Sequence, residues 1–101
     1  MTRIAVDHDK IADFCRRYHV KRLSFFGSVL RDDFGPESDV DMLVEFESDQ
    51  TPGYFGLAEM EFELADLLRV DRKVDLRTPR ELSRYFRDEV VAGAEVVYAT
   101  A

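Results

Sequence analysis

A pair of aspartates at the start of an apolar segment constrains this chain more than any other feature. Asp39 and Asp41 flank Val40, and the segment 40–46 is otherwise typical of a strand, although strands are usually poor in aspartate. Residues i and i+2 of a strand point to one face, roughly 6.5 to 7 Å apart, so the two carboxylates would repel each other. Mg²⁺ takes carboxylate oxygens as ligands and would turn that repulsion into binding. The sequence therefore predicts a metal site at one end of a strand.

A glycine-serine pair precedes these aspartates, with ten residues between Ser28 and Asp39. The segment 23–26 is typical of a strand, and Gly27 and Ser28 end it before a short helix expected at about 29–33. Glycine lets backbone N–H groups approach a phosphate, a serine hydroxyl adds a hydrogen bond, and a helix N-terminus favours negative charge. Phosphate on one side and metal on the other is the arrangement that nucleotidyl transfer requires.

Several residues in this stretch together resemble a known signature. They are Phe26, Gly27, Ser28, Arg31, Ser38, Asp39, Val40, Asp41, Leu43 and Val44. The pattern is similar to that of the polymerase beta-like nucleotidyltransferase superfamily. More narrowly, it resembles the superfamily's minimal members, the MNT-type antitoxins encoded beside HEPN-domain toxins. The resemblance extends over most of the chain, although Asp32 stands where many relatives have glycine.

The resemblance implies a set of site residues. The superfamily carries a third carboxylate on a strand that follows the next helix, and Asp75 in the alternating segment 73–77 is the candidate there. From residue counting alone, Asp75 would be a surface residue and Arg31 a solvated helix residue. The implied catalytic and metal-binding residues are Asp39, Asp41 and Asp75. The implied nucleotide-binding residues are Gly27, Ser28, Arg31 and Ser38, with ATP as co-substrate and Mg²⁺ as cofactor.

The negative net charge disfavours a surface that binds nucleic acid. The net charge is −7 and the isoelectric point is near 4.7, so a template-dependent polymerase or a general RNA binder is not expected. A metal ion and a few arginines can still reverse the sign of one local site for ATP. An acidic surface would also suit a basic protein partner.

The chain shows no sign of an oxidising or membrane environment. Cys15 is the only cysteine, which excludes an internal disulfide, and it lies on the apolar stripe of a helix where a buried structural role is expected. No leader or membrane-spanning segment is evident, and we expect a cytoplasmic protein without membrane contact.

Apolar spacing predicts the remaining elements. Helical spacing predicts helices at about 7–18 and 55–68, and composition favours a final strand within 94–99. Thr78, Pro79 and Glu81 form a helix start, and that helix would turn Leu82, Tyr85, Phe86 and Val90 inward before ending near Gly93. The order of elements predicts one α/β (α+β) domain over 1–101, with a small mixed β-sheet and helices packed on one face. By resemblance, this is a nucleotidyltransferase palm.

Three functions remain open at this level. The resemblance implies an antitoxin that transfers AMP from MgATP to a tyrosine hydroxyl of a HEPN-domain toxin, and it is compatible with a hetero-oligomer of the two. A second reading is a non-catalytic antitoxin that neutralises the toxin by binding alone. A third is nucleotidyl transfer to a small molecule, which palms of this kind generally perform with a second domain.

Overall fold

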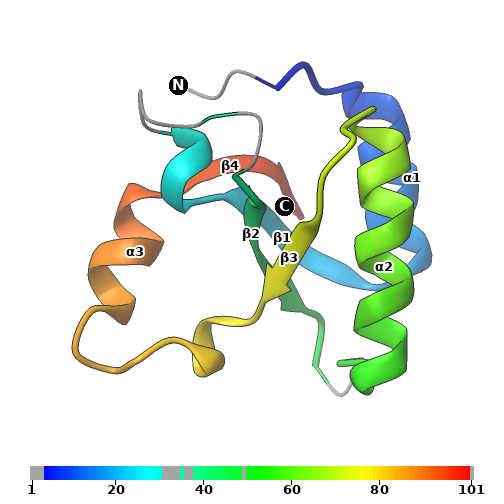
Figure 1. Cartoon of the computed structure of the whole chain (residues 1–101). Helices are drawn as coiled ribbons and strands as arrows, with labels where there is room; N and C mark the ends of the chain where they lie inside the picture. The colour runs from blue at the N-terminus through cyan, green and yellow to red at the C-terminus, as the bar shows by residue number, and fades with distance from the viewer. Residues whose placement is uncertain (1–3, 31–34, 36–37, 49, 101) are drawn as a thin grey trace.

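A four-stranded mixed sheet organises the chain. The computed structural model describes residues 4–30, 35, 38–48 and 50–100 (Figure 1). The elements run in the order α1 (His8–Arg17), β1 (Val20–Phe25), a 3₁₀ turn (Gly27–Leu30), β2 (Val40–Phe46), α2 (Tyr54–Leu67), β3 (Val74–Arg77), a second 3₁₀ turn (Pro79–Glu81), α3 (Arg87–Gly93) and β4 (Glu95–Ala99). The strand order is β3-β2-β1-β4, with β1 antiparallel to β2 and β4, and with β2 parallel to β3.

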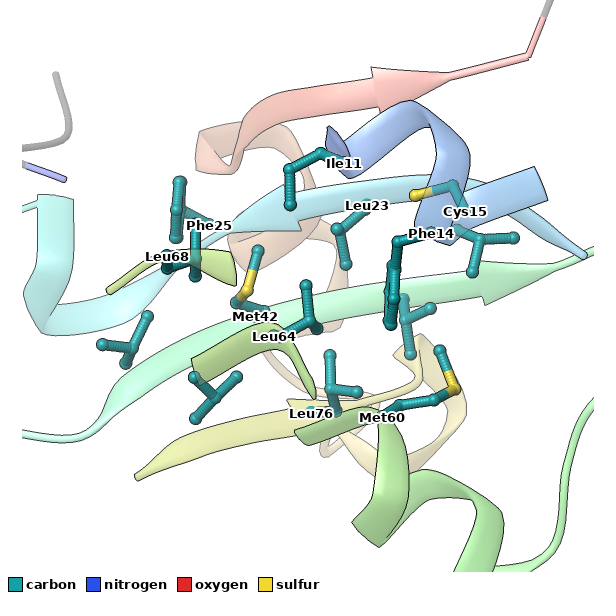
Figure 2. Packing of buried hydrophobic residues seen from close by; sticks show 14 of the residues in the cluster. Ile11, Phe14, Cys15, Leu23, Phe25, Met42, Met60, Leu64, Leu68 and Leu76 are labelled. Carbon is teal, nitrogen blue, oxygen red and sulfur yellow. The ribbon is translucent and has the colours of Figure 1, made fainter. Parts of the chain in front are cut away.

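One face of the sheet is covered by α1 and α2. The two helices lie side by side on the same side of the strands (Figure 1). Their apolar residues pack with inward residues of β1, β2 and β3 in one core, and Phe14, Phe25, Met42, Met60 and Leu64 are fully buried there (Figure 2). By contrast, α3 contributes no buried residue. The predicted mixed sheet, with the core-forming helices on one face, is therefore confirmed.

The free edge of β3 is partly covered by α2. Glu61 on α2 accepts a hydrogen bond from the backbone N–H of Leu76 at 2.8 Å. An exposed edge strand presents backbone groups that can form hydrogen bonds with another chain. A side chain that bonds to one of these groups makes such pairing less favourable. No helix among the described residues has the length and hydropathy needed to cross a membrane.

The helix predicted from Thr78 to Gly93 is wrong as a single element. The capping box of Thr78 and Glu81 forms as expected, but Leu82 is extended, with ψ of 147°, and the chain becomes helical again only at Arg87. Tyr85 and Phe86 are 85% and 50% exposed instead of inward. The serine hydroxyl of Ser83 accepts a hydrogen bond from the N–H of Tyr85, and such local bonds compete with the helical ones.

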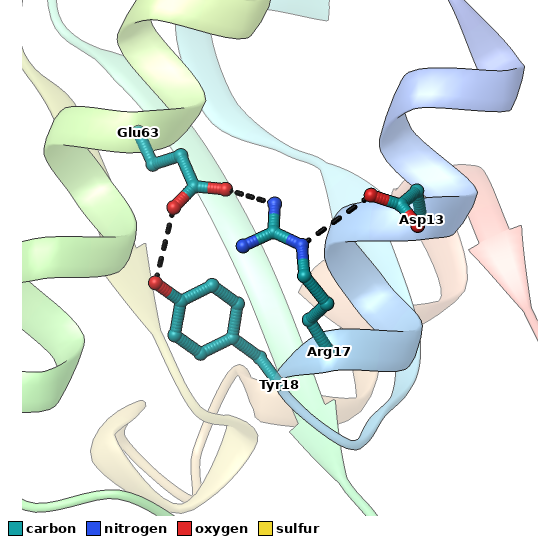
Figure 3. Close-up of polar contacts among 4 residues, drawn as sticks. All are labelled: Asp13, Arg17, Tyr18 and Glu63. Atoms are coloured by element: carbon teal, nitrogen blue, oxygen red, sulfur yellow. Dashed lines mark hydrogen bonds and ion pairs between the residues drawn. The ribbon is translucent and has the colours of Figure 1, made fainter.

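A polar cluster joins α1 to α2 at the rim of the core (Figure 3). Arg17 donates hydrogen bonds to Glu63 on α2 and, at 3.3 Å, to Asp13 one turn earlier on α1. The hydroxyl of Tyr18 donates to the other oxygen of Glu63 at 3.1 Å. The Arg17 guanidinium is the main cause that lowers the pKa of Glu63, with a smaller contribution from the Tyr18 hydroxyl.

We expect Glu63→Gln to lower the free energy of unfolding at neutral pH. Because the folded protein depresses the pKa of Glu63, its stabilising contribution is complete above the unfolded value of about 4.3 and is lost as the pH falls through the lower folded value. Urea unfolding from pH 7 to pH 3 should show the gap between wild type and variant closing in acid. Asp66→Asn, an exposed change on the same helix, serves as control; a gap that widens in acid would contradict this role for Glu63.

Cys15 should be chemically inert while the protein is folded. The side chain is fully buried, and burial raises the pKa of the thiol to about 12, so almost no thiolate forms near neutral pH. We expect iodoacetamide at pH 8 to leave the native protein unmodified and to alkylate it fully in denaturant, as measured by intact mass. Rapid alkylation of the native protein would show that the core around α1 opens readily.

Candidate functional site

The parallel pairing of β2 with β3 sets two acidic residues beside each other. The register aligns Asp41 with Asp75, and the N–H of Val40 donates to the carbonyl of Lys73 at 2.9 Å. Residues in register on neighbouring strands point to the same face, and their backbones lie about 4.8 Å apart. Val40 and Met42 point into the core, so the two aspartates face away from α1 and α2.

The glycine-serine bend lies directly against Asp41, one of these two residues. The N–H of Phe26 donates to the carbonyl of Asp41 at 3.0 Å, which holds the end of β1 to the start of β2. Gly27 adopts φ of +75°, a conformation that favours glycine, and a Cβ atom there would lie only 2.6 Å from Oδ2 of Asp41. Gly27 is therefore required both by its backbone conformation and by the close approach of a carboxylate.

The other predicted site residues differ in burial and in how the structure places them beside Asp41 and Asp75. Asp39 is exposed and immediately precedes β2, and Ser28 is partly buried in the 3₁₀ turn. The hydroxyl of Ser38 accepts a hydrogen bond from the N–H of Gly35 at 3.1 Å, shortly before β2 begins. Arg31 falls outside the described residues, and its predicted role stays a prediction.

Two arginines near the site were not anticipated from the sequence. Arg77, two residues after Asp75 on the same face of β3, donates to the Asp75 carboxylate at 3.2 Å. Arg72 donates to the carbonyl of Gly35 at 2.9 Å and so connects the residue pair before β3 to Gly35, which precedes β2 in the sequence. The spacing of Asp75 and Arg77 was the available signal, because alternate residues of a strand share one face.

The acidic residues match the preference of a hard cation only in part. Asp41 and Asp75 offer carboxylate oxygens from neighbouring strands, which is suitable chemistry for Mg²⁺. In the described part of the chain, however, no group of three or more His, Cys, Asp or Glu residues lies close enough to hold a metal ion. The arrangement thus brings two carboxylates and the Gly27 bend together, with one of the two carboxylates paired to Arg77.

Comparison with known proteins identifies this arrangement. The family model described as "Nucleotidyltransferase domain" matches residues 8–97, which include both strands of the site and the bend. The chain belongs to this nucleotidyltransferase family. The resemblance inferred from the glycine-serine pair and the aspartates is therefore confirmed at the level of the family.

Sequence relatives of this nucleotidyltransferase include several Methanocaldococcus jannaschii chains named as candidate protein adenylyltransferases. One is 44% identical over 69 residues, which are 68% of this chain and 64% of the relative. Another is 30% identical over 82 residues, which are 81% of this chain and 84% of the relative. The match therefore spans somewhat less than two thirds of the first relative's own length.

Solved structures show the same nucleotidyltransferase fold. A candidate minimal nucleotidyltransferase is 33% identical with a TM-score of 0.67, over 86% of this chain and 85% of the other. A toxin–antitoxin structure with AMP-PNP is 25% identical with a TM-score of 0.69, over 94% of this chain and 75% of the other. The mixed sheet with its covering helices is thus the palm that the resemblance implied.

Gly27→Ala should damage the site and the fold together. The added methyl group meets Oδ2 of Asp41 in a backbone conformation that is unfavourable for alanine, so we expect a loss of at least about 1 kcal/mol in the free energy of unfolding. Binding of AMP-PNP should weaken at the same time. Gly93→Ala is the matched control, because nothing lies within 4 Å of a Cβ atom there; equal stability of the two variants would contradict the close approach of Gly27 to Asp41.

Proposed function

We propose that this chain is an antitoxin that acts as a protein adenylyltransferase, transferring AMP from MgATP to a tyrosine hydroxyl of a HEPN-domain toxin. The observation that carries this proposal is the register of Asp41 with Asp75 beside the Gly27 bend. Residues 1–101 form one minimal nucleotidyltransferase domain in this proposal, and the cytoplasm is the compartment expected for it.

The nucleotide would bind between the bend and the aspartates. Backbone N–H groups at Gly27 and Ser28 suit the phosphates, because glycine permits close approach and the 3₁₀ turn begins there. Arg31 and Ser38 would add contacts to the triphosphate. Asp39 and Asp41 would hold Mg²⁺, with Asp75 added once Arg77 releases it, and the bound ion would supply positive charge to the triphosphate oxygens.

Transfer then requires an acceptor in line with the α-phosphorus. The tyrosine oxygen forms a new bond to this phosphorus, the bond to the departing pyrophosphate breaks, and the hydroxyl proton passes to a base. Asp75 suits that role, because it lies next to Asp41 on the same face and is 20% exposed. Since Asp75 is paired with Arg77 in this structure, Arg77 has to release it during the reaction.

The comparisons support the enzymatic reading in two ways. Relatives of comparable size are named for protein adenylylation, and a structure 25% identical to this chain is a toxin–antitoxin structure with AMP-PNP. The chain's own net charge of −7 favours a basic protein as the acceptor over a nucleic acid. A hetero-oligomer with the toxin would bring the acceptor and the palm together.

A second function is neutralisation by binding alone. The ion pair between Arg77 and Asp75 favours it, because it occupies the carboxylate that would serve as base. The two functions differ in one observable, which is whether AMP is found on the toxin.

Labelled ATP, Mg²⁺ and a HEPN-domain toxin test the proposal directly. Wild type should label the toxin, and Asp39→Asn combined with Asp41→Asn should slow labelling about 10²-fold or more, because the proposed metal ligands lose their charge. Asp88→Asn, an exposed change on α3, is the control and should label at the wild-type rate. Labelling that survives the double change would remove the proposed site, and full neutralisation of an unlabelled toxin would favour the binding function.

A further inference from the structure

One side of α2 carries an exposed stripe in which aromatic and acidic residues alternate. Phe55 and Phe62 are 82% and 81% exposed, although they lie on a helix whose opposite side forms the core. Glu59 and Asp66 are exposed as well, and with the two phenylalanines they occupy positions i, i+4, i+7 and i+11. Residues at these positions share one side of a helix, and the two phenylalanines are about 10 Å apart along its axis. We name these four residues the α2 stripe.

The stripe borders a cavity at the edge of the sheet. Phe62, Ala65, Val70 and Val74 supply apolar surface to a cavity of about 460 Å³, with Glu61 and Lys73 among its polar residues. The cavity therefore lies between α2 and the start of β3, which is an edge strand. A large exposed aromatic side chain beside an apolar hollow is typical of a surface that another protein covers.

Charge decides among the possible occupants. The cavity lining is balanced in charge, with Arg72 and Lys73 beside Glu61 and Asp71. The exposed acids Glu59 and Asp66 on the α2 stripe therefore set the negative sign of this surface, on a chain whose net charge is −7. A second copy would bring its own Glu59 and Asp66 against these acids, and nucleic acid or an anionic membrane would be repelled. A protein surface with apolar side chains flanked by lysine or arginine is complementary.

The cavity lies at the same edge of the sheet as Asp75. Lys73 belongs to the cavity and immediately precedes β3, two residues before Asp75 in the sequence. No strand lies beyond β3 in the described sheet order. A protein seated on the α2 stripe can therefore reach around this edge toward Asp41 and Asp75.

We infer that the α2 stripe and its cavity form the docking surface for a basic protein partner, with an apolar side chain of the partner seated beside Phe62. The inference rests on the proposed function for the partner's identity, which is the HEPN-domain toxin. The partner binds across α2 and presents its acceptor hydroxyl around the edge of β3. Docking depends on the α2 stripe, and transfer depends on the aspartates.

The test measures binding and transfer separately with full-length proteins. Binding of the HEPN-domain toxin is measured without ATP by calorimetry, and transfer is measured with labelled ATP over a range of toxin concentrations. Phe62→Ser should weaken binding at least about tenfold and raise the KM for the toxin with kcat unchanged, as expected for an anchoring aromatic residue. Asp66→Lys should also weaken binding, because the new lysine repels a basic partner surface. This loss of affinity should be larger at low salt than at high salt, since salt screens the repulsion.

Matched controls separate docking from folding and from catalysis. Val96→Ser removes an exposed apolar side chain, 52% exposed, from β4 at the opposite edge of the sheet, and should bind the toxin as wild type does. Thermal unfolding should be unchanged by Phe62→Ser, because that ring is mostly in solvent. Asp41→Asn should bind the toxin as wild type does and should transfer AMP much more slowly than wild type.

The outcomes are distinct. If wild type transfers AMP but Phe62→Ser binds the toxin within about twofold of wild type, the docking inference is overturned and the proposed function stands. If wild type binds the toxin without transferring AMP, and Phe62→Ser alone weakens that binding, the docking inference stands and the catalytic function falls. If wild type does not bind the toxin, both are overturned.

Discussion

The parallel pairing of β2 with β3 is the constraint on which the site depends. Its register is fixed where the N–H of Val40 donates to Lys73, and it places Asp41 beside Asp75 while Val40 and Val74 enter the core. A shift by one residue would turn the apolar side chains outward and the aspartates into the core. The same burial that stabilises the sheet thus also selects the face on which the acidic residues lie.

Much of this arrangement could be predicted from the sequence, because it follows local patterns. The strand after Asp39, the amphipathic helix around Phe14 and the helix 55–68 were each indicated by apolar spacing, and all three are present. The sequence predicted that Gly27 and Asp41 belong to the same site, but it did not predict their direct contact. That contact depends on the antiparallel pairing of β1 with β2, which brings the two residues together.

The errors and omissions have a common origin in contacts that no local pattern records. The pattern of Leu82, Tyr85, Phe86 and Val90 suited a helix, yet α3 buries none of its residues and no core holds that segment in helical form. The ion pair of Arg77 with Asp75 was also missed, although their spacing would have allowed it. Arg17 and Glu63, which are 46 residues apart in the sequence, meet only because α1 and α2 lie side by side.

The acidic character of the chain has different consequences on the two sides of the sheet. On the face of β2 and β3, negative charge gathers at Asp41 and Asp75, where a cation and a triphosphate would balance each other. On α2, it lines a helix whose exposed phenylalanines offer apolar contact. Both are compatible with one protein that holds a nucleotide on one face and a basic partner on another.

A crystal structure with AMP-PNP and Mn²⁺ tests the central claim most directly. Anomalous scattering locates Mn²⁺, which shares the preference of Mg²⁺ for oxygen ligands. We predict an ion in contact with the Asp41 carboxylate, the triphosphate against Gly27 and Ser28, and Arg77 withdrawn from Asp75. An ion and nucleotide bound elsewhere, with the pair of Arg77 and Asp75 still intact, would contradict the account.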